Sequence, residues 1–221
     1  MIFYKNIFEI ADNNFITTIE SLEFIIKDFN LEELVKEITN DSEWLRFICK
    51  KSYSHSNGFD KLTLFRGSNL RVRLHIYWLD NKNKNPNIHD HRWNFSSFII
   101  KGSYKSEIYE ISDVGTDKFL YHYYSQASNK QNYELDFIKK VKLAHIETKE
   151  YAENDINTGK AGEIHRIILN DEKLTVSLFI TSNYENNYAR VLTNDAKLKG
   201  EKLNSNNLTK KEVIKKLKSI L

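Results

Sequence analysis

The feature that most constrains the fold is a change in the spacing of apolar residues at about residue 62. From Leu62 to Tyr184, apolar residues recur at every second position, and β-branched and aromatic types dominate. The clearest stretch alternates two sets of residues: Val72, Leu74, Ile76 and Trp78, and between them Arg71, Arg73, His75 and Tyr77. An extended strand points successive side chains to opposite faces, so this period predicts half-buried strands.

Further stretches of the same kind cover residues 94–100, 104–111, 119–124, 142–147, 164–169 and 175–181. Turns rich in Asn, Asp and Gly separate them. Many short strands broken in this way indicate a mainly β fold, an antiparallel barrel or sandwich.

Helical patterns flank the strands on both sides. Between residues 14 and 50, apolar residues recur at intervals of three and four, which predicts two or three short helices, one of them capped by Asp41. Near the C-terminus, Thr209 and Glu212 have the spacing of a capping box, and an apolar stripe follows. We expect this basic last helix to pack on the barrel or to contact another subunit. The predicted division is a helical segment over 1–60 packed on a barrel over 61–184, and an extension with a helix over 185–221.

Composition limits the environment and the partners. The chain has 221 residues, 40% of them hydrophobic, so it can bury a core. Its 33 Lys and Arg against 30 Asp and Glu leave a net charge of +3, which gives no reason to expect nucleic acid as a partner. The single cysteine, Cys49, forms no redox motif and fits a reducing cytoplasm. No apolar run approaches the roughly 18 residues of a membrane span, and we expect a monomer or homodimer without a membrane partner.

Three histidines form the strongest candidate site. His89 and His91 lie two apart, so on a strand both imidazoles would project to one face. His165 lies in a second strand-like stretch with a glycine, Gly162, close by. Three imidazoles would leave coordination positions open, which is typical of a catalytic rather than a structural metal.

These residues resemble the two metal-binding motifs of the cupin superfamily. The likeness rests on His89-Asp90-His91, Gly102 eleven residues later, and Gly162-x-x-His165, and it covers roughly residues 60 to 184. It implies an antiparallel double-sheet barrel, a jelly roll. Within cupins, the chain is most similar to thiol dioxygenases of the cysteine dioxygenase type, which implies Fe(II) held by His89, His91 and His165. In that family an arginine on an earlier strand binds the substrate carboxylate, and Arg66 is the best local match.

The departures from the family pattern bear on the reaction. Many cupins carry a fourth, glutamate ligand where this chain has Phe95, and a proline where it has Lys160. Thiol dioxygenases follow the last metal histidine with a strand that bears serine, histidine and tyrosine at alternate positions. Here that strand carries Ser177, Phe179 and Thr181. The resemblance therefore supports the fold and the metal more firmly than it supports cysteine as substrate.

The substrate-binding residues depend on which strand face is internal. Arginine can grip a carboxylate with two hydrogen bonds, so Arg66, Arg71 and Arg73 are all candidates. If the Val72 to Trp78 set lines the barrel, Arg71 and Arg73 point outward, which favours Arg66 and makes Trp78 a wall of the pocket.

The other histidines have weaker claims on the site. We expect His75 and His122 to be surface or hydrogen-bonded structural residues, and His55 to lie in an exposed loop. His145 and Glu147 share a strand face and could add a ligand or an acid.

The expected function is a non-haem ferrous cupin oxygenase, dioxygenase-like, that uses O2. Its substrate would be a small metal-chelating molecule with a carboxylate or thiol. The alternatives are a cupin with Zn, Ni or Mn that performs isomerisation or hydrolysis, and a small-molecule-binding cupin. A structural or interaction domain without metal is a third possibility. Because loop conformations shape the pocket, the sequence does not name the substrate.

Overall fold

The computed structural model describes residues 3–15, 17–55, 58–79, 86–125, 133–170, 173–197 and 208–221. Four helices come first: α1 (Phe3–Asn14), α2 (Thr18–Ile26), α3 (Leu31–Asn40) and α4 (Ser42–Lys51). Asp41 caps α4 by accepting hydrogen bonds from the backbone N–H groups of Glu43 and Trp44. After the strands, α5 (Lys210–Ser219) begins at the predicted capping box of Thr209 and Glu212. No helix in these ranges is long and apolar enough to cross a membrane.

One antiparallel sheet has six strands in the order β1-β2-β3-β11-β5-β9. Its strands are β1 (Tyr53–His55), β2 (Phe59–Arg66), β3 (Arg71–Tyr77), β5 (Phe95–Lys101), β9 (Ile156–Gly159) and β11 (Thr175–Thr181). The other strands pair in the order β10-β4-β12-β7-β8-β6, and this second sheet closes on itself. They are β4 (Ile88–His89), β6 (Ser103–Ser112), β7 (Thr116–Ser125), β8 (Tyr133–Ala152), β10 (Ile164–Leu169) and β12 (Ala189–Thr193).

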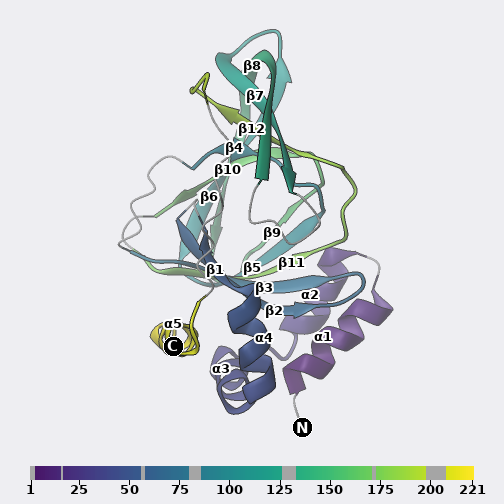
Figure 1. The fold of residues 1–221 in the computed structure, drawn as a ribbon, viewed down its shortest axis with the longest axis vertical. Helices are drawn as coiled ribbons and strands as arrows, with labels where there is room; N and C mark the ends of the chain where they lie inside the picture. The colour runs from purple at the N-terminus through teal and green to yellow at the C-terminus, as the bar shows by residue number, and fades with distance from the viewer. Residues whose placement is uncertain are drawn as a thin grey trace.

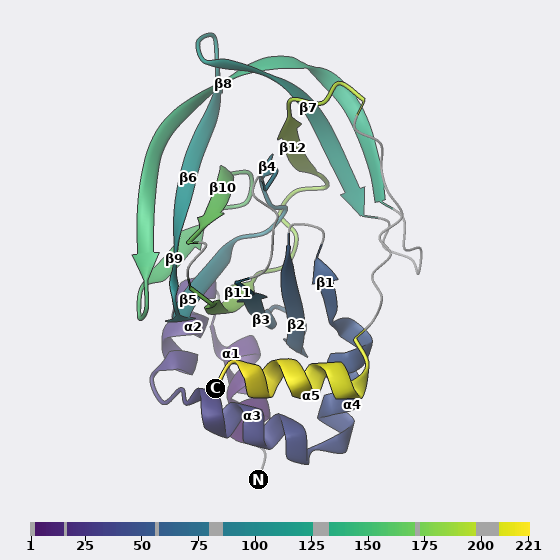
Figure 2. The same cartoon turned by 90° about the vertical axis from the view of Figure 1, so that its left-hand side faces the viewer.

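The order of the strands is that of a jelly roll. Strands β3, β11, β5 and β9 are neighbours in the first sheet, and β4, β10, β6 and β8 are neighbours in the second. Along the chain these eight strands alternate between the two sheets, except that β6 and β8 lie in the same one, as in a double Greek key. Strands β7 and β12 are additions to these eight, and the long β8 arches over the end of the molecule (Figure 2).

The helices lie against the outer face of the six-stranded sheet, as Figures 1 and 2 show. Apolar side chains of β2, β3 and β11 pack there with those of the helices, in one continuous core. The sheet's contribution includes Leu62, Leu64, Val72, Leu74, Ile76, Val176, Leu178 and Ile180. The opposite face of this sheet is turned toward β10, β4 and β12. It carries the polar side chains that alternate along the strands with these apolar ones.

The mainly β architecture with helices at both ends confirms the predicted fold class. Strands β10 and β11 begin and end at the predicted residues, and the predicted strand over 142–147 is part of the longer β8. Helix α1 was not predicted, because its residues precede the stretch from residue 14 in which apolar residues recur at intervals of three and four. The predicted boundary at 61 falls inside β2, and β12 continues the second sheet beyond 184.

Candidate metal centre

The three predicted histidines meet between the two sheets. His89 lies on β4, His91 just after it and His165 on β10, and one ligand nitrogen from each lies within 4.8 Å of the others. His89 and His165 are direct partners across the β4–β10 pair. The ring centroids of the three histidines are 4.9 to 5.0 Å apart in each of the three pairs. The structure therefore brings together residues separated by 74 positions in the sequence.

Backbone contacts orient two of the imidazoles. The Nδ1 atom of His89 lies 2.8 Å from the carbonyl oxygen of Asn87, and Nδ1 of His165 lies 3.1 Å from that of Glu163. A carbonyl only accepts, so Nδ1 of each ring is the protonated nitrogen. This tautomer leaves the Nε2 lone pair of each ring available for a metal ion.

Asp90, between the two neighbouring histidines, points away from them and is anchored by Arg190 of β12. The carboxylate of Asp90 accepts hydrogen bonds from the Arg190 backbone N–H at 2.6 Å and from its Nε at 2.5 Å. The same guanidinium also donates to the carbonyl oxygen of Gly162. The Gly162 N–H in turn donates to the His91 carbonyl oxygen at 2.9 Å. Arg190 therefore ties the segment of His89 and His91 to the turn that leads into His165.

Aromatic rings close the other sides of the trio. Phe95 lies 5.5 Å from the rings of both His91 and His165, and Phe179 stacks on Phe95 at 5.1 Å. Trp93 stacks on His91 at 5.4 Å. A phenyl ring occupies the place where many cupins have a glutamate ligand, so the cluster found among the described residues is made of histidines alone.

Burial disfavours the charged form of the three imidazoles. It lowers the pKa of His89 and His91, and it lowers the pKa of His165 to about 3. The neighbouring imidazoles act in the same direction on His91. Neutral imidazole is the form that binds metal ions.

The strand faces near the site are the reverse of the condition that favoured Arg66 and Trp78. Val72, Leu74 and Ile76 belong to the core beneath the helices, so they do not line the barrel. Trp78 packs against that same core and donates a hydrogen bond to Asp60, which places it away from the histidines. The condition for its predicted role as a wall of the pocket is therefore not met.

Arg66 is exposed at the end of β2, opposite Arg71 of β3. Its predicted contact with substrate stays a prediction.

The remaining histidines lie outside the metal cluster. His75 is 6% exposed and stacks on Phe179 at 4.4 Å, so it is part of the barrel interior and not of the surface.

His145 is exposed near Thr148, and Glu147 pairs with Lys149, so neither joins the metal cluster. His122 stacks on Tyr188 at 3.7 Å, as a structural residue would.

Two cations lie in the barrel interior, of which Lys61 was not predicted and Arg73 was one of three arginine candidates. Arg73 is 6% exposed, and its guanidinium carbon lies 5.7 Å from the centroid of the Trp93 ring. Lys61 of β2 donates a hydrogen bond to the Tyr53 hydroxyl at 3.2 Å. The sequence held an indication of this arrangement. The amphipathic helices before residue 51 need an apolar surface to pack on, and if they cover the apolar face of the sheet, its polar face is left to line the barrel interior.

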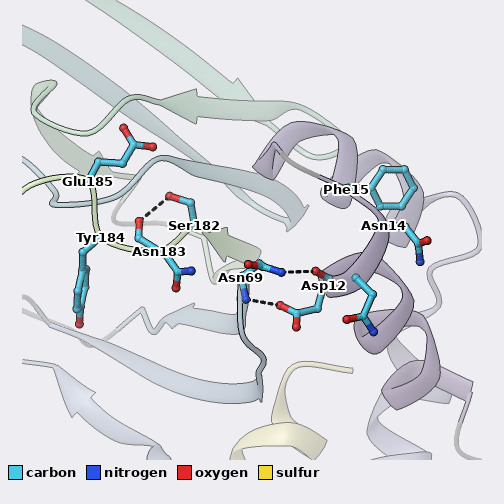
Figure 3. A pocket seen from close by; sticks show the side chains of 9 residues that line it. Asp12, Asn14, Phe15, Asn69, Ser182, Asn183, Tyr184 and Glu185 are labelled. Atoms are coloured by element: carbon cyan, nitrogen blue, oxygen red, sulfur yellow. Dashed lines mark hydrogen bonds between the residues drawn. The ribbon is translucent and has the colours of Figure 1, made fainter.

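A polar pocket of about 350 Å³ lies elsewhere, between the end of α1 and residues 182–185. Figure 3 shows Asp12 hydrogen-bonded to Asn69 at its edge. The Asp12 carboxylate accepts hydrogen bonds from three backbone N–H groups, of Ser68, Asn69 and Leu70, so it holds a turn. None of the three clustered histidines lines this pocket.

Comparisons with known proteins give a limited likeness. No protein-family model and no curated protein matches the chain. Among solved structures, the chain is similar to a polyketide cyclase from Streptomyces resistomycificus, with a TM-score of 0.38 and 10% identity over 66% of this chain and 82% of that one. An uncharacterised double-stranded β-helix protein from Klebsiella pneumoniae gives 0.35 and 11%, over 66% and 94%. A hydroquinone 1,2-dioxygenase from a Sphingomonas species gives 0.33 and 5%, over 56% and 65%. These values are too low to place the chain in a family or to transfer an activity.

Proposed function

We propose that the chain is a metal-dependent enzyme of cupin type, a ferrous oxygenase that acts with O2 on a small chelating substrate bearing a carboxylate or thiolate. The observation that carries the proposal is the convergence of three histidines, one buried and two partly buried, on one point between the sheets. A site with histidine ligands only leaves a divalent ion its full charge and open coordination positions.

The donor set fits a single ion. Metal–nitrogen bonds are about 2.0–2.1 Å long, so two nitrogens on one ion lie at most about 4.2 Å apart. The nitrogens of the trio all lie within 4.8 Å of one another, so small side-chain rotations are enough to close them on an ion. When bound, iron would supply a redox-active centre with positions open to a chelating substrate.

The chain's own groups would hold, orient and shield this centre. His89, His91 and His165 provide the nitrogens, and Arg190 fixes both ligand-bearing segments. The rings of Phe95, Phe179 and Trp93 surround the trio with apolar surface, which excludes water from the reacting groups.

Metal analysis of anaerobically purified protein tests the proposal. We expect a single iron per chain and oxygen consumption when small thiols or carboxylates are added. His89→Ala and His165→Ala should each lose the metal, while His145→Ala, which removes an exposed imidazole, should keep it. Stoichiometric zinc without oxygen consumption would favour non-redox chemistry, and metal retained in both site variants would refute the histidine centre.

A further inference from the structure

The barrel interior contains buried polar atoms that have no hydrogen-bond partner. In the described residues, four such side-chain atoms are found: Nη1 of Arg73, Nε2 of His75, Nε1 of Trp93 and Oγ1 of Thr181. A buried polar group without a partner is costly, and such groups are uncommon in native folds. Their occurrence together therefore calls for an explanation.

All four atoms belong to one region. Phe179 of β11 pairs with Arg73 of β3, and Thr181 lies two residues further along the same face of β11. His75 stacks on Phe179, and Trp93 lies between Arg73 and His91. The unpaired atoms thus surround the same interior space as the histidine trio.

The region is also positively charged. Neither Arg73 nor Lys61 takes part in any ion pair among the described residues. Burial lowers the pKa of Arg73 to about 10, and it lowers the pKa of Lys61 well below its usual value. Lys61 is the register partner of His75, and Arg73 lies over Trp93, which stacks on His91, so both cations lie near the metal site.

A row of arginines connects this region to the surface. Arg66 is exposed at the end of β2, Arg71 opposite it is partly buried, and Arg73 two residues further is buried. Arg71 donates to the Ser182 carbonyl oxygen and lies over the Tyr184 ring, contacts that leave its charge unbalanced. Like charges aligned in this way raise the potential along the path and attract anions.

We propose that Lys61 and Arg73 form a binding site for the dianionic end of the substrate, a phosphate group or a pair of carboxylates, beside His91. An oxyanion supplies the acceptors that Arg73 Nη1 and Trp93 Nε1 lack. Two interior cations need two negative charges, because a monoanion would leave one of them uncompensated. This inference rests on the proposed metal centre only in that the other end of the same substrate would face the histidines.

Anion binding to the metal-free, full-length protein tests this site directly. The chelator-treated protein is titrated with inorganic phosphate, malonate or acetate at matched ionic strength, by calorimetry and thermal unfolding. We expect phosphate or malonate to bind and to raise the Tm, and acetate to have little effect. Phosphate alone would identify a phosphate group, and malonate alone a dicarboxylate.

Lys61→Met and Arg73→Met should each weaken the binding of the dianion about tenfold or more. Both variants should fold and have an unliganded Tm at least equal to that of the wild type, because each removes a buried uncompensated charge. Lys139→Met, on the exposed face of β8, is the matched control and should bind as the wild type does.

Equal binding of acetate and the dianions would overturn the proposal. So would absence of binding, or wild-type binding by both site variants. These outcomes are independent of the metal, because loss of iron in the histidine variants is measured separately. Failure of the metal centre would leave the anion titration of the chelated protein unchanged.

Discussion

At the scale of single residues, Arg190 explains how two distant segments present their histidines to one point. Its Nε and backbone N–H hold both carboxylate oxygens of Asp90, and its Nη2 contacts the Gly162 carbonyl oxygen. Asp90 is 4% exposed, so this pair is shielded from water. Charge-assisted hydrogen bonds in such a setting fix geometry as well as add stability.

We therefore expect Arg190→Met to weaken metal binding about 10- to 100-fold, the usual effect of losing a group that orients metal ligands. The variant keeps the three histidines, so any change in affinity reports their positioning. The measurement is a competition titration against a chelator of known affinity, with circular dichroism to confirm folding.

Arg166→Met is the matched control. Arg166 follows His165 directly, but its guanidinium pairs with Glu107 at 2.5 Å on the other face of β10. Metal affinity should stay close to that of the wild type in this variant. Equal losses in Arg190→Met and Arg166→Met would mean that general destabilisation, and not positioning, weakens the site.

At the scale of elements, α5 is fastened to the six-stranded sheet by a buried carboxylate. Asp60 of β2 is 2% exposed, and it accepts hydrogen bonds from Ser54 Oγ, Trp78 Nε1 and the Lys216 ammonium group of α5. This contact explains why the basic helix packs on the barrel region, one of the two arrangements expected from the sequence.

Lys216→Met should lower the free energy of unfolding by about 1–3 kcal/mol, because it leaves the buried carboxylate without its cation. Lys215→Met, one residue away and exposed, should change it by less than about 0.5 kcal/mol. Urea unfolding of the two variants measures the difference. Equal stability of the two would show that Asp60 needs no countercharge.

The strands show how far the sequence could be interpreted. Alternation identified β3 and β11 and separated their two faces, because the period of a strand is fixed by its backbone. It could not show which face is internal. In this fold the apolar face of β3 serves the helices, and the polar face with Arg73 and His75 lines the barrel. This arrangement removes the condition under which Trp78 would form a pocket wall and Arg73 would point outward.

At the scale of the whole molecule, the polar barrel interior makes stability depend on pH. Burial lowers the pKa of His55 to about 3 and the pKa of His75 well below its ordinary value, and Lys61 and Arg73 add repulsion to both. In the unfolded chain these imidazoles protonate near pH 6.5. The folded form therefore binds fewer protons than the unfolded form between about pH 3 and 6.5.

Stability should consequently fall as the pH decreases through that window and be fully retained above it. His55 and His75 should each lower the free energy of unfolding by about 1.4 kcal/mol between pH 7.5 and 5.5. His75→Phe replaces the imidazole by a ring that suits its neighbours Phe59 and Phe179, and it should remove the contribution of His75, about 1.4 kcal/mol, from the total loss. Urea unfolding of chelated protein at the two pH values measures this, and an unchanged loss in the variant would show that His75 already protonates normally in the fold.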